Sequence, residues 1–374
     1  MKSFCMDASV NAKHHGEIWK KMKPLLPSKT KSNSMIVLFE NNALITDSLL
    51  VAETFNDYFC NMAASEGNQK DVTDFRDHSS IKSIVKIFGT DTSFDFQPIT
   101  SDYIKGILIN LNPRKAVGCD NISQRLLRIS TPVITQPLTK LINHLITSCD
   151  RPEVWKCSNV HPIYKKSEET DKTNYRPVSI LTAVSKIYEK VMFDQIYDSF
   201  SCKLSQNLSG YLRGHSCCTA LLKMTEDWRE SPDKREAVAA VAVDLSKAFD
   251  SVCHSLLLAK LKAFGFSERA LKLMTNYLCD RKQRVKLDGV YSRWRTVKTG
   301  VPQGSLLGPL LFNLYMNDLN YFVEDTSLRL YADDTTGYAS DTSPAILEFV
   351  INSDLKIMTN WLQHNYLQIN AKKT

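Results

Sequence analysis

Seven consecutive apolar residues, Ala237–Val243, directly precede Asp244 near the middle of the chain. A short apolar run that contains valines and is bounded by charge is typical of a β-strand that is buried on both faces of a sheet. A pair of acids, Asp333 and Asp334, lies between two short apolar segments, which predicts a strand, an acidic turn and a second strand. The fold must therefore accommodate carboxylates at the ends of its strands.

The three carboxylates would converge if the strand that ends at Asp244 lies beside the acidic turn in one antiparallel sheet. Carboxylates in a low-dielectric interior must be paired or bind metal. Three convergent carboxylates that hold two Mg²⁺ ions about 3.5–4 Å apart form the two-metal site of phosphoryl transfer. Magnesium prefers such oxygen ligands and leaves positions open for substrate phosphates. An exposed turn, the commoner setting of an Asp-Asp pair, is the alternative.

The composition is that of a globular protein, with 374 residues, 43% hydrophobic and 23% charged residues, and a formal net charge of +7. These values exclude disordered, collagen-like and coiled-coil chains. No segment approaches the roughly 20 apolar residues of a membrane span, so no membrane partner is expected. The N-terminal residues lack the apolar stretch of a secretory signal, and the ten cysteines include no CxxC pair. We therefore predict an intracellular protein with reduced thiols, in the nucleus or the cytoplasm.

The densest positive charge lies in residues 281–298, which contain seven lysines and arginines and a single acid, Asp288. Asp288 and Gly289 predict a type I′ turn, so the segment is expected to form a two-stranded ribbon. The ribbon also carries the aromatic residues Tyr291 and Trp294. Clustered cations of this kind suit the phosphate backbone of a nucleic acid. A solvated surface hairpin is an equally weighted alternative on charge alone.

Apolar periodicity and capping residues predict helices at 49–59, 101–111, 122–150, 182–200, 254–264, 268–279, 306–319 and 344–363. The third of these is expected to be interrupted at Pro132 and Pro137. Short strands are expected at 35–39 and within 158–181, and a loop at 65–80. Asp250 is predicted to cap the helix that begins near residue 254. The motif HSCC at 215–218 has no second pair of ligands at zinc spacing, so zinc is not expected.

Three segments resemble, in order, the motifs of reverse transcriptases. VDLSKAFDSV at 243–252 looks like their first aspartate motif, GVPQGSLLGPLLF at 300–312 like the loop and helix that follow, and LYADD at 330–334 like their catalytic hairpin. Further blocks narrow the resemblance to LINE-type non-LTR retrotransposons of animals: LNPRKAVGCDNI (111–122), NYRPVSIL (174–181), SGYLRGHSCCTA (209–220) and WLQHNYLQINAKK (361–373). The resemblance covers about residues 106–374.

The resemblance implies an α+β fold, the fingers and palm of a right-hand polymerase with a small antiparallel palm sheet and no thumb. Residues 106–374 would form the reverse transcriptase domain, and residues 1–105 a connector or N-terminal extension after a missing endonuclease. The implied function is RNA-directed DNA polymerisation, with an RNA template, a DNA primer and dNTPs as partners. The alternative is a catalytically weak nucleic-acid-binding remnant of the same element. The oligomeric state is left open.

By position, the resemblance assigns Asp244, Asp333 and Asp334 as ligands of two Mg²⁺ ions, or of Mn²⁺ in their place. The backbone carbonyl of Leu245 would be a further metal ligand. Lys373 would act in catalysis, as the lysine that protonates pyrophosphate. For Lys373, exposed surface is an equally weighted alternative.

The resemblance also implies two sets of binding residues. The incoming nucleotide would be bound by Phe249, Gln303, Gly304, Arg176 and Lys166, or by Lys165 beside it. Phe249 would be the steric gate that excludes a 2′-hydroxyl, and a core aromatic residue is its alternative. For Lys166 the alternative is exposed surface. Template and primer would be bound by the basic ribbon, through Arg281, Lys282, Arg284, Lys286, Arg293 and Arg295.

Overall fold

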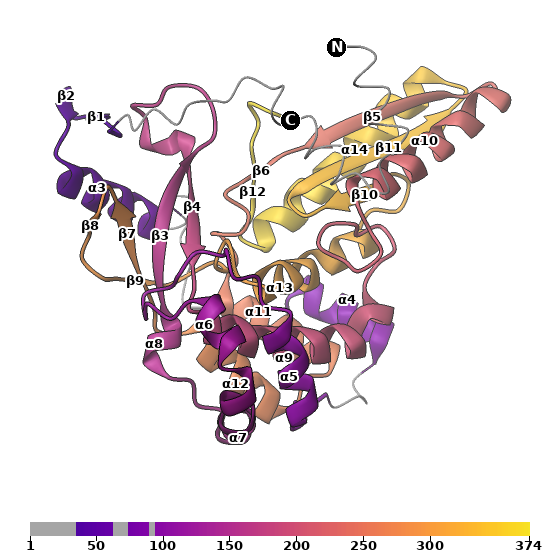
Figure 1. Cartoon of the computed structure of the whole chain (residues 1–374). Coiled ribbons are helices and arrows are strands. Elements are labelled where there is room, and N and C mark those ends of the chain that lie inside the picture. Colours follow the sequence, from indigo (N-terminus) through magenta and orange to yellow (C-terminus); the bar gives the residue numbers. More distant parts are fainter. Residues whose placement is uncertain (1–34, 63–73, 90–93) are drawn as a thin grey trace, which may run out of the picture.

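The computed structural model describes residues 35–62, 74–89 and 94–374 and has a mixed α/β fold with small sheets. Two arms rise from a base of helices (Figure 1). The arm on the left of the figure contains a five-stranded sheet, and the arm on the right contains a three-stranded sheet. The predicted combination of helices with small sheets is confirmed. The predicted loop at 65–80 lies largely outside the described residues, as do the N-terminal residues examined for a signal.

The first arm combines a sheet with one long helix. Its elements are β1 (Leu38–Glu40), β2 (Ala43–Ile45), α3 (Ser48–Asn61), β3 (Cys157–Tyr164), β4 (Tyr175–Ile180), β7 (Arg281–Leu287), β8 (Val290–Tyr291) and β9 (Arg295–Val297). The sheet has the order β4-β3-β7-β8, with β9 also paired with β7, and only β3 and β7 are parallel. Phe55 of α3 shares a buried cluster with Tyr175 and Val285 of the sheet. Residues 35–62, which the sequence assigns to an N-terminal extension, therefore share a core with this sheet.

The second arm combines the three-stranded sheet with two helices. Its elements are α10 (Cys217–Asp233), β5 (Ala237–Val243), β10 (Ser327–Tyr331), β11 (Asp334–Asp341) and α14 (Pro344–His364). The central strand β11 pairs antiparallel with both β10 and β5. The prediction that β5 is buried on both faces is wrong, because only Val243 of its seven residues is buried. β5 is an edge strand, and its four alanines have little apolar surface that must be removed from water.

The base encloses the main hydrophobic core. Its helices are α4 (Ser79–Phe88), α5 (Ser101–Ile109), α6 (Gln124–Ile129), α7 (Thr131–Ser148), α8 (Glu153–Lys156), α9 (Ala183–Phe200), α11 (His254–Phe264), α12 (Glu268–Leu278) and α13 (Leu307–Met316). Tyr188, Phe264 and Phe312 are fully buried there, and burial of such large aromatic side chains is a major source of stability. Among the described helices, none has both the length and the apolar character of a membrane span.

Most helix boundaries in the base follow local signals. α11 begins and ends at the predicted residues, and Gly265 after it has a φ of +108°, the left-handed conformation that commonly ends a helix. The predicted interruption at Pro137 is wrong, because α7 continues through it. Proline has no backbone N–H, so the carbonyl of Val133 loses its helical donor. Val133 is 76% exposed, so water can satisfy that carbonyl. The sequence predicts no helix at α4 or α10, so the structure adds these two helices to the predicted set.

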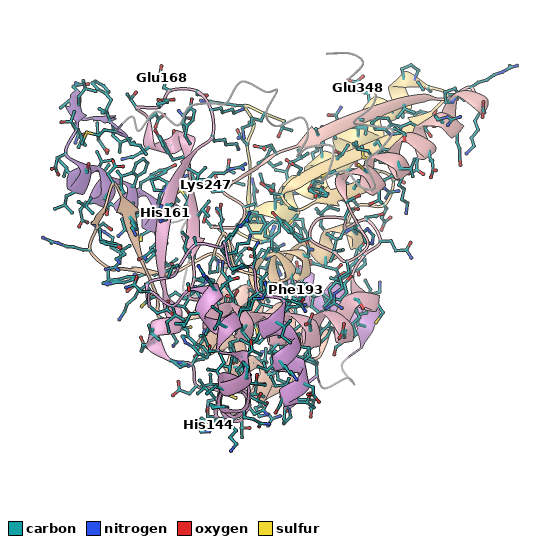
Figure 2. All side chains as sticks on the ribbon, in the orientation of Figure 1. His144, His161, Glu168, Phe193, Lys247 and Glu348 are labelled. Atoms are coloured by element: carbon teal, nitrogen blue, oxygen red, sulfur yellow. The ribbon has the colours of Figure 1, made fainter. Side chains whose placement is uncertain are left out.

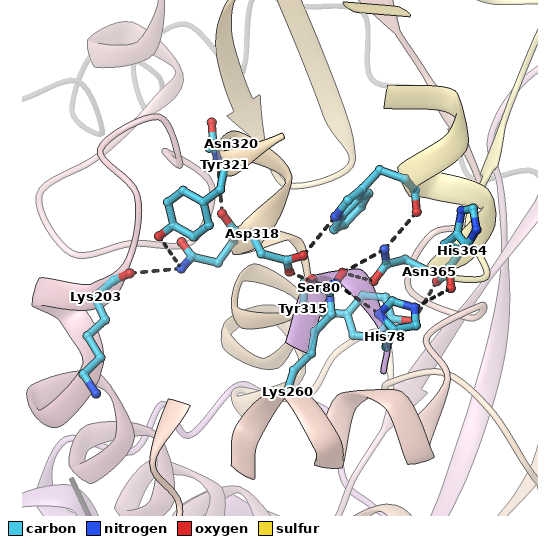
Figure 3. A network of polar contacts seen from close by, with 12 residues as sticks. His78, Ser80, Lys203, Lys260, Tyr315, Asp318, Asn320, Tyr321, His364 and Asn365 are labelled. Atoms are coloured by element: carbon cyan, nitrogen blue, oxygen red, sulfur yellow. Dashed lines mark hydrogen bonds and ion pairs between the residues drawn. The ribbon is translucent and has the colours of Figure 1, made fainter. Parts of the chain in front are cut away.

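A buried polar network ties the base to α14 (Figure 3). Lys260 of α11 donates to Asp318 at 2.6 Å and to the backbone carbonyl of Tyr315 at 2.7 Å, and neither charged side chain is exposed. Trp361 of α14 donates its indole N–H to the same carboxylate at 2.9 Å. Tyr315 in turn donates its hydroxyl to the carbonyl of Asn365, just after α14, at 2.7 Å. The C-terminal end of α14 is thereby anchored to the core.

The segment after α14 returns to the junction of the two arms. There β12 (Gln368–Ile369) pairs antiparallel with β6 (Leu245–Ser246), which follows β5 and Asp244. The backbone N–H of Asn370 donates to the backbone carbonyl of Asp244 at 2.8 Å. The anchored end of α14 therefore determines how the last residues of the chain lie against Asp244.

Candidate active site

A cleft of about 620 Å³ lies where the two arms meet. Its walls include Tyr58 from α3 and Arg176 from β4 on one side, and Asp244 and Asp333 on the other. Figure 2 shows Lys247, which also lines the cleft, between the arms. The predicted site residues in its lining are Lys165, Lys166, Arg176, Asp244, Leu245, Phe249, Gln303, Gly304, Asp333 and Lys373. The fold thus brings together residues that are distant in the sequence.

Strand pairing brings Asp244 to the acidic turn. Continued by one position, the register of β5 and β11 sets Asp334 opposite Asp244. The Oδ2 atom of Asp244 accepts hydrogen bonds from Lys373 Nζ at 2.7 Å and from Asn370 Nδ2 at 2.8 Å. Partial burial acts to raise the pKa of Asp244, but these two donors outweigh it and lower the pKa below its usual value. Asp244 is therefore ionised and is balanced by a lysine.

Asp333 occupies the tight turn between β10 and β11 together with Ala332. Ala332 has a φ of +58°, a conformation that costs a residue with a Cβ roughly 1–2 kcal/mol. Burial raises the pKa of Asp333, and the carboxylate of Asp334 raises it further. A half-buried acid beside other acids gains from a bound cation, because the cation relieves both the desolvation and the repulsion.

The carboxylates do not form a complete metal site by themselves. Asp334 is exposed, and of the three aspartates Asp244 and Asp333 line the cleft. Across residues 35–62, 74–89 and 94–374, no group of three or more His, Cys, Asp or Glu side chains is arranged to hold a metal ion. The oxygen donors nevertheless suit a divalent cation, and the Lys373 ammonium against Asp244 marks a position that favours positive charge.

Gly210 supports the acidic turn from behind. A Cβ at this residue would lie 2.4 Å from the backbone nitrogen of Ala332. The backbone N–H of Ser209 donates to the carbonyl of Leu330 at 2.8 Å, and the side-chain amide of Asn313 donates to the carbonyl of Gly210 at 2.7 Å. The backbone of this loop can approach the turn so closely only because residue 210 is glycine.

Replacement of Gly210 by alanine is expected to displace the acidic turn, because the new Cβ would overlap backbone atoms that cannot rotate away. We expect Gly210→Ala to lower the free energy of unfolding by about 1–3 kcal/mol, as overpacking does. Urea denaturation measures the effect. The control is Gly106→Ala in α5, where a Cβ meets open space and should stabilise the helix by about 0.5–1 kcal/mol. Equal effects of the two replacements would contradict the argument.

The loop before α13 forms another wall of the cleft. Gln303 donates its side-chain amide to Asp250 Oδ2 at 2.6 Å. A Cβ at Gly304 would lie 2.5 Å from the carbonyl oxygen of Ser179, so glycine permits this close approach. The prediction that Asp250 caps α11 is wrong, because Cys253 is the N-cap residue of that helix. Asp250 instead holds the side chain of Gln303.

Phe249 contacts both the core and the cleft. Its ring stacks on Phe312 of the core with 4.5 Å between the centroids, and Tyr211 meets it edge-on at 6.3 Å. The residue is only partly buried and also lines the cleft. Phe249 is therefore a residue at the border of the core whose accessible part contributes to the cleft wall.

Cations surround the acids of the cleft. Arg176 lies close enough to Asp333 to oppose the rise of its pKa. Burial lowers the pKa of Lys165, and the neighbouring charges of Arg176 and Lys373 lower it further. Lys166 is exposed and lines the same cleft. Carboxylates and cations in one cleft suit a ligand that brings both phosphates and a divalent metal.

The cleft lining also includes residues to which the sequence assigns no role, among them Tyr58, Tyr211, Lys247 and Asn370. Lys247 Nζ lies 5.3 Å from the ring centroid of Tyr58, a cation–π contact that joins α3 to the segment after Asp244. Tyr211, Lys247 and Asn370 lie in sequence blocks that resemble those of reverse transcriptases, so their place in these blocks could have identified them as site residues. Tyr58 lies outside these blocks, in the segment 55–59, which the resemblance assigns to the connector and not to the site.

The turn of the basic ribbon forms as predicted, but the ribbon is not two-stranded, because β8 and β9 both pair with β7 and β7 also pairs with β3. Asp288 and Gly289 have φ values of +46° and +87°, as a type I′ turn requires. Its six predicted template residues do not share one surface, however. Arg281 is only 4% exposed, and Arg295 pairs with Asp57 of α3 at 2.9 Å. Strand alternation places Lys282, Arg284 and Lys286 on the other face of β7, and Arg293 is exposed.

Comparison with known families agrees with this geometry. The family model described as "Reverse transcriptase (RNA-dependent DNA polymerase)" matches residues 163–374, more than half of the chain. The chain therefore belongs to the reverse transcriptase family. All the site residues predicted from the sequence lie within the matched range.

Individual relatives come from mobile elements. The chain is 28% identical over 298 residues to the "Probable RNA-directed DNA polymerase from transposon BS" of Drosophila melanogaster, covering 75% of this chain and 32% of that protein. It is 26% identical over 294 residues to the "RNA-directed DNA polymerase from mobile element jockey" of the same species, with the same two coverages. The Pol polyprotein of the type-1 retrotransposable element R2 of Popillia japonica is 22% identical over 293 residues, or 75% of this chain and 39% of that protein.

The chain thus spans about a third of the length of these relatives. The resemblance to reverse transcriptases of non-LTR retrotransposons is confirmed.

Proposed function

We propose that this chain is an RNA-directed DNA polymerase that joins dNTPs to the 3′-hydroxyl of a DNA primer on an RNA template. The observation that carries the proposal is the convergence of Asp244 and Asp333 with Arg176 and Lys165 in one cleft. In this proposal the five-stranded sheet belongs to the fingers and the three-stranded sheet to the palm. Template, primer and dNTPs are intracellular, so the chain would act in the nucleus or the cytoplasm.

Asp244, Asp333 and Asp334 would hold two divalent cations, Mg²⁺ or Mn²⁺, with the carbonyl of Leu245 as a further ligand. The raised pKa of Asp333 supports this assignment, and so does the Lys373 ammonium, a positive charge that already lies against Asp244. Such ions supply activation of the primer hydroxyl and neutralisation of the triphosphate. Lys373 would leave Asp244 and could then donate its proton to the pyrophosphate.

The remaining cleft residues would bind the nucleotide. Arg176 would grip the triphosphate together with Lys166 or Lys165, as cations at the rim of the cleft. Gln303 would contact the incoming nucleotide, with Asp250 fixing its side chain. Gly304 would let the backbone approach closely, because it has no side chain.

Shortening Phe249 tests its role as the gate against ribonucleotides. We expect Phe249→Val to raise the relative kcat/KM for rATP over dATP by about 10- to 100-fold, because the variant leaves room for a 2′-hydroxyl. Single-nucleotide extension measures both constants. The control is Phe193→Val in α9. The ring centroid of Phe193 lies 5.6 Å from that of Tyr197, and neither residue is part of the cleft lining. A selectivity that does not change in Phe249→Val would remove the gate assignment.

The alternative function is a nucleic-acid-binding remnant without turnover, and the lysine that already balances Asp244 is the observation in its favour. Extension of a DNA primer on an RNA template by the purified chain, with dNTPs and Mg²⁺, separates the two. Extension supports the polymerase. A folded chain that binds template and primer but does not extend supports the remnant.

A further inference from the structure

Glu189 of α9 is a buried carboxylate that lies outside the lining of the cleft. Its exposed fraction is 0%. The Oε1 atom accepts a hydrogen bond of 2.9 Å from the hydroxyl of Tyr277 in α12, and the Oε2 atom accepts one of 2.9 Å from the backbone N–H of Leu306. Both helices lie in the base (Figure 1). Burial of a carboxylate is costly unless the group is hydrogen-bonded and its charge is balanced, so a buried acid here requires both.

Two buried arginines provide positive charge near Glu189. Arg151 and Arg281 are each 4% exposed, and their guanidinium carbons lie 4.9 and 5.4 Å from the ring centroid of Tyr277. Arg151 also donates to the hydroxyl of Ser185, one turn before Glu189 in α9, at 2.5 Å. Burial and the charge of Arg281 lower the pKa of Arg151 to about 10, so this side chain stays protonated at neutral pH. Glu189 therefore belongs to a compact group of charged and aromatic side chains that fixes its carboxylate.

The second partner of this carboxylate, Leu306, marks the start of α13. Leu306 is the N-cap residue of that helix, and its side chain makes no capping hydrogen bond. The first N–H groups of a helix have no acceptor within the helix, so acceptors must come from elsewhere. Glu189 supplies one, and its negative charge suits the positive end of the helix dipole. The residues just before Leu306, namely Gln303, Gly304 and Ser305, line the cleft. A short stretch of backbone therefore connects the buried carboxylate to the cleft wall.

Contacts from different parts of the fold fix the loop that carries Gln303. From the first arm, the backbone N–H of Ser179 donates to the carbonyl of Gln303 at 2.7 Å. Within the cleft, the side chain of Gln303 donates to Asp250 at 2.6 Å. From the base, Glu189 binds the N–H three residues further on. Asp250 lines the cleft and Glu189 does not, so the contact with Glu189 can be removed without replacing a residue of the cleft wall.

We propose that Glu189 is a positioning residue of the active site, which sets where Gln303 lies against the incoming dNTP by fixing the start of α13. That Gln303 contacts a dNTP rests on the proposed function. A displacement of about 1 Å in such a contact can lower a rate by about 100-fold. Glu189 lies outside the cleft lining, so its effect passes through the loop.

Addition of a single dATP by variants that break one hydrogen bond each tests the proposal. Glu189→Met keeps the length of the side chain but accepts no hydrogen bond, so we expect KM for dATP to rise by about 5- to 20-fold and kcat to stay within about threefold. Glu189→Gln keeps an acceptor for Leu306 and should keep KM within about twofold of the unmodified chain. Tyr277→Phe removes the other hydrogen bond and should leave KM unchanged. Unchanged KM in Glu189→Met, with kcat lowered only in proportion to the folded fraction, would overturn the proposal.

A double-mutant cycle identifies the path from Glu189 to the nucleotide. In a Gln303→Ala chain, Glu189→Met should raise KM by no more than about twofold, since the side chain that the carboxylate positions is already absent. Fully additive effects of the two replacements would contradict the proposed path. Glu189→Asp serves if Glu189→Met does not fold, because it keeps the charge on a side chain shorter by one methylene. It should also raise KM by at least about threefold.

Hydrogen exchange followed by mass spectrometry tests the structural step without catalysis. In the absence of substrates, we expect the peptide that contains Leu306 to exchange at least about tenfold faster in Glu189→Met than in Tyr277→Phe or the unmodified chain. Equal exchange in all three would overturn the proposal. If the unmodified chain extends no primer, the proposed polymerase fails, while the exchange result still decides whether Glu189 fixes the start of α13.

Discussion

Replacing Asp333 and Asp334 together by asparagine is expected to lower primer extension by at least about 10³-fold, which corresponds to about 4 kcal/mol of transition-state stabilisation. Asparagine keeps the size of each side chain but removes two of the three charges that would hold divalent cations. The initial rate of extension on an RNA template, measured with Mg²⁺ and then with Mn²⁺, gives the effect. A variant that keeps more than a tenth of the rate would exclude the acidic turn from the chemistry.

The same variant should not be less stable than the unmodified chain. The pKa of Asp333 is raised in the folded state, so the folded state binds the proton more tightly than the unfolded state does. Stability of the unmodified chain therefore falls as pH rises through that pKa, and asparagine removes this cost at neutral pH. Thermal melting at pH 7 should show an equal or higher midpoint. The matched control is Glu324→Gln/Asp325→Asn, an adjacent pair of exposed acids, which should leave extension unchanged.

Asp318→Asn is expected to lower the free energy of unfolding by about 3–5 kcal/mol, because it leaves the ammonium of Lys260 buried without its counter-charge. Both side chains of this pair are fully buried. Trp361 would also lose a charged acceptor for its indole N–H. Urea denaturation followed by circular dichroism measures the loss.

An exposed ion pair of the same length provides the control. Lys262 and Glu268 are also 2.6 Å apart, but their side chains are 65% and 80% exposed. Glu268→Gln should therefore change the free energy of unfolding by only about 0–1 kcal/mol. A double replacement of Lys260 by Met and Asp318 by Leu should recover much of the stability lost in Asp318→Asn, because no buried charge then remains unpaired. Similar losses of unfolding free energy in Asp318→Asn and Glu268→Gln would show that burial does not determine how much such a pair contributes to stability.

The buried pair also bears on the candidate active site. It anchors α14, and the residues just after α14 include Asn370 and Lys373, which both donate to Asp244. A variant that breaks the buried pair therefore removes an anchor of the helix that precedes these two donors. The stability of the core and the electrostatics of the cleft are therefore linked through one helix.

Local features were predictable because they depend on a few neighbouring residues. The bounds of α11, the turn at Asp288 and Gly289, and the acidic turn between two strands all follow from periodicity and turn chemistry. The acids and their likeness to a catalytic hairpin were also visible in the sequence. One local signal was overlooked, since Ser216 and Thr219 form a capping box that starts α10.

Contacts between distant residues were decided by the tertiary structure. That Lys373 reaches Asp244 depends on residues 129 positions apart and on the anchoring of α14. Arg281, read from the sequence as a surface cation, is buried because β7 joins a sheet that α3 covers. The sequence by itself determined which chemical groups this chain carries and the local shape around each. Only the tertiary structure decided which of them share a cleft and which strand remains at an edge, because pairing and burial depend on segments that lie far apart in the chain.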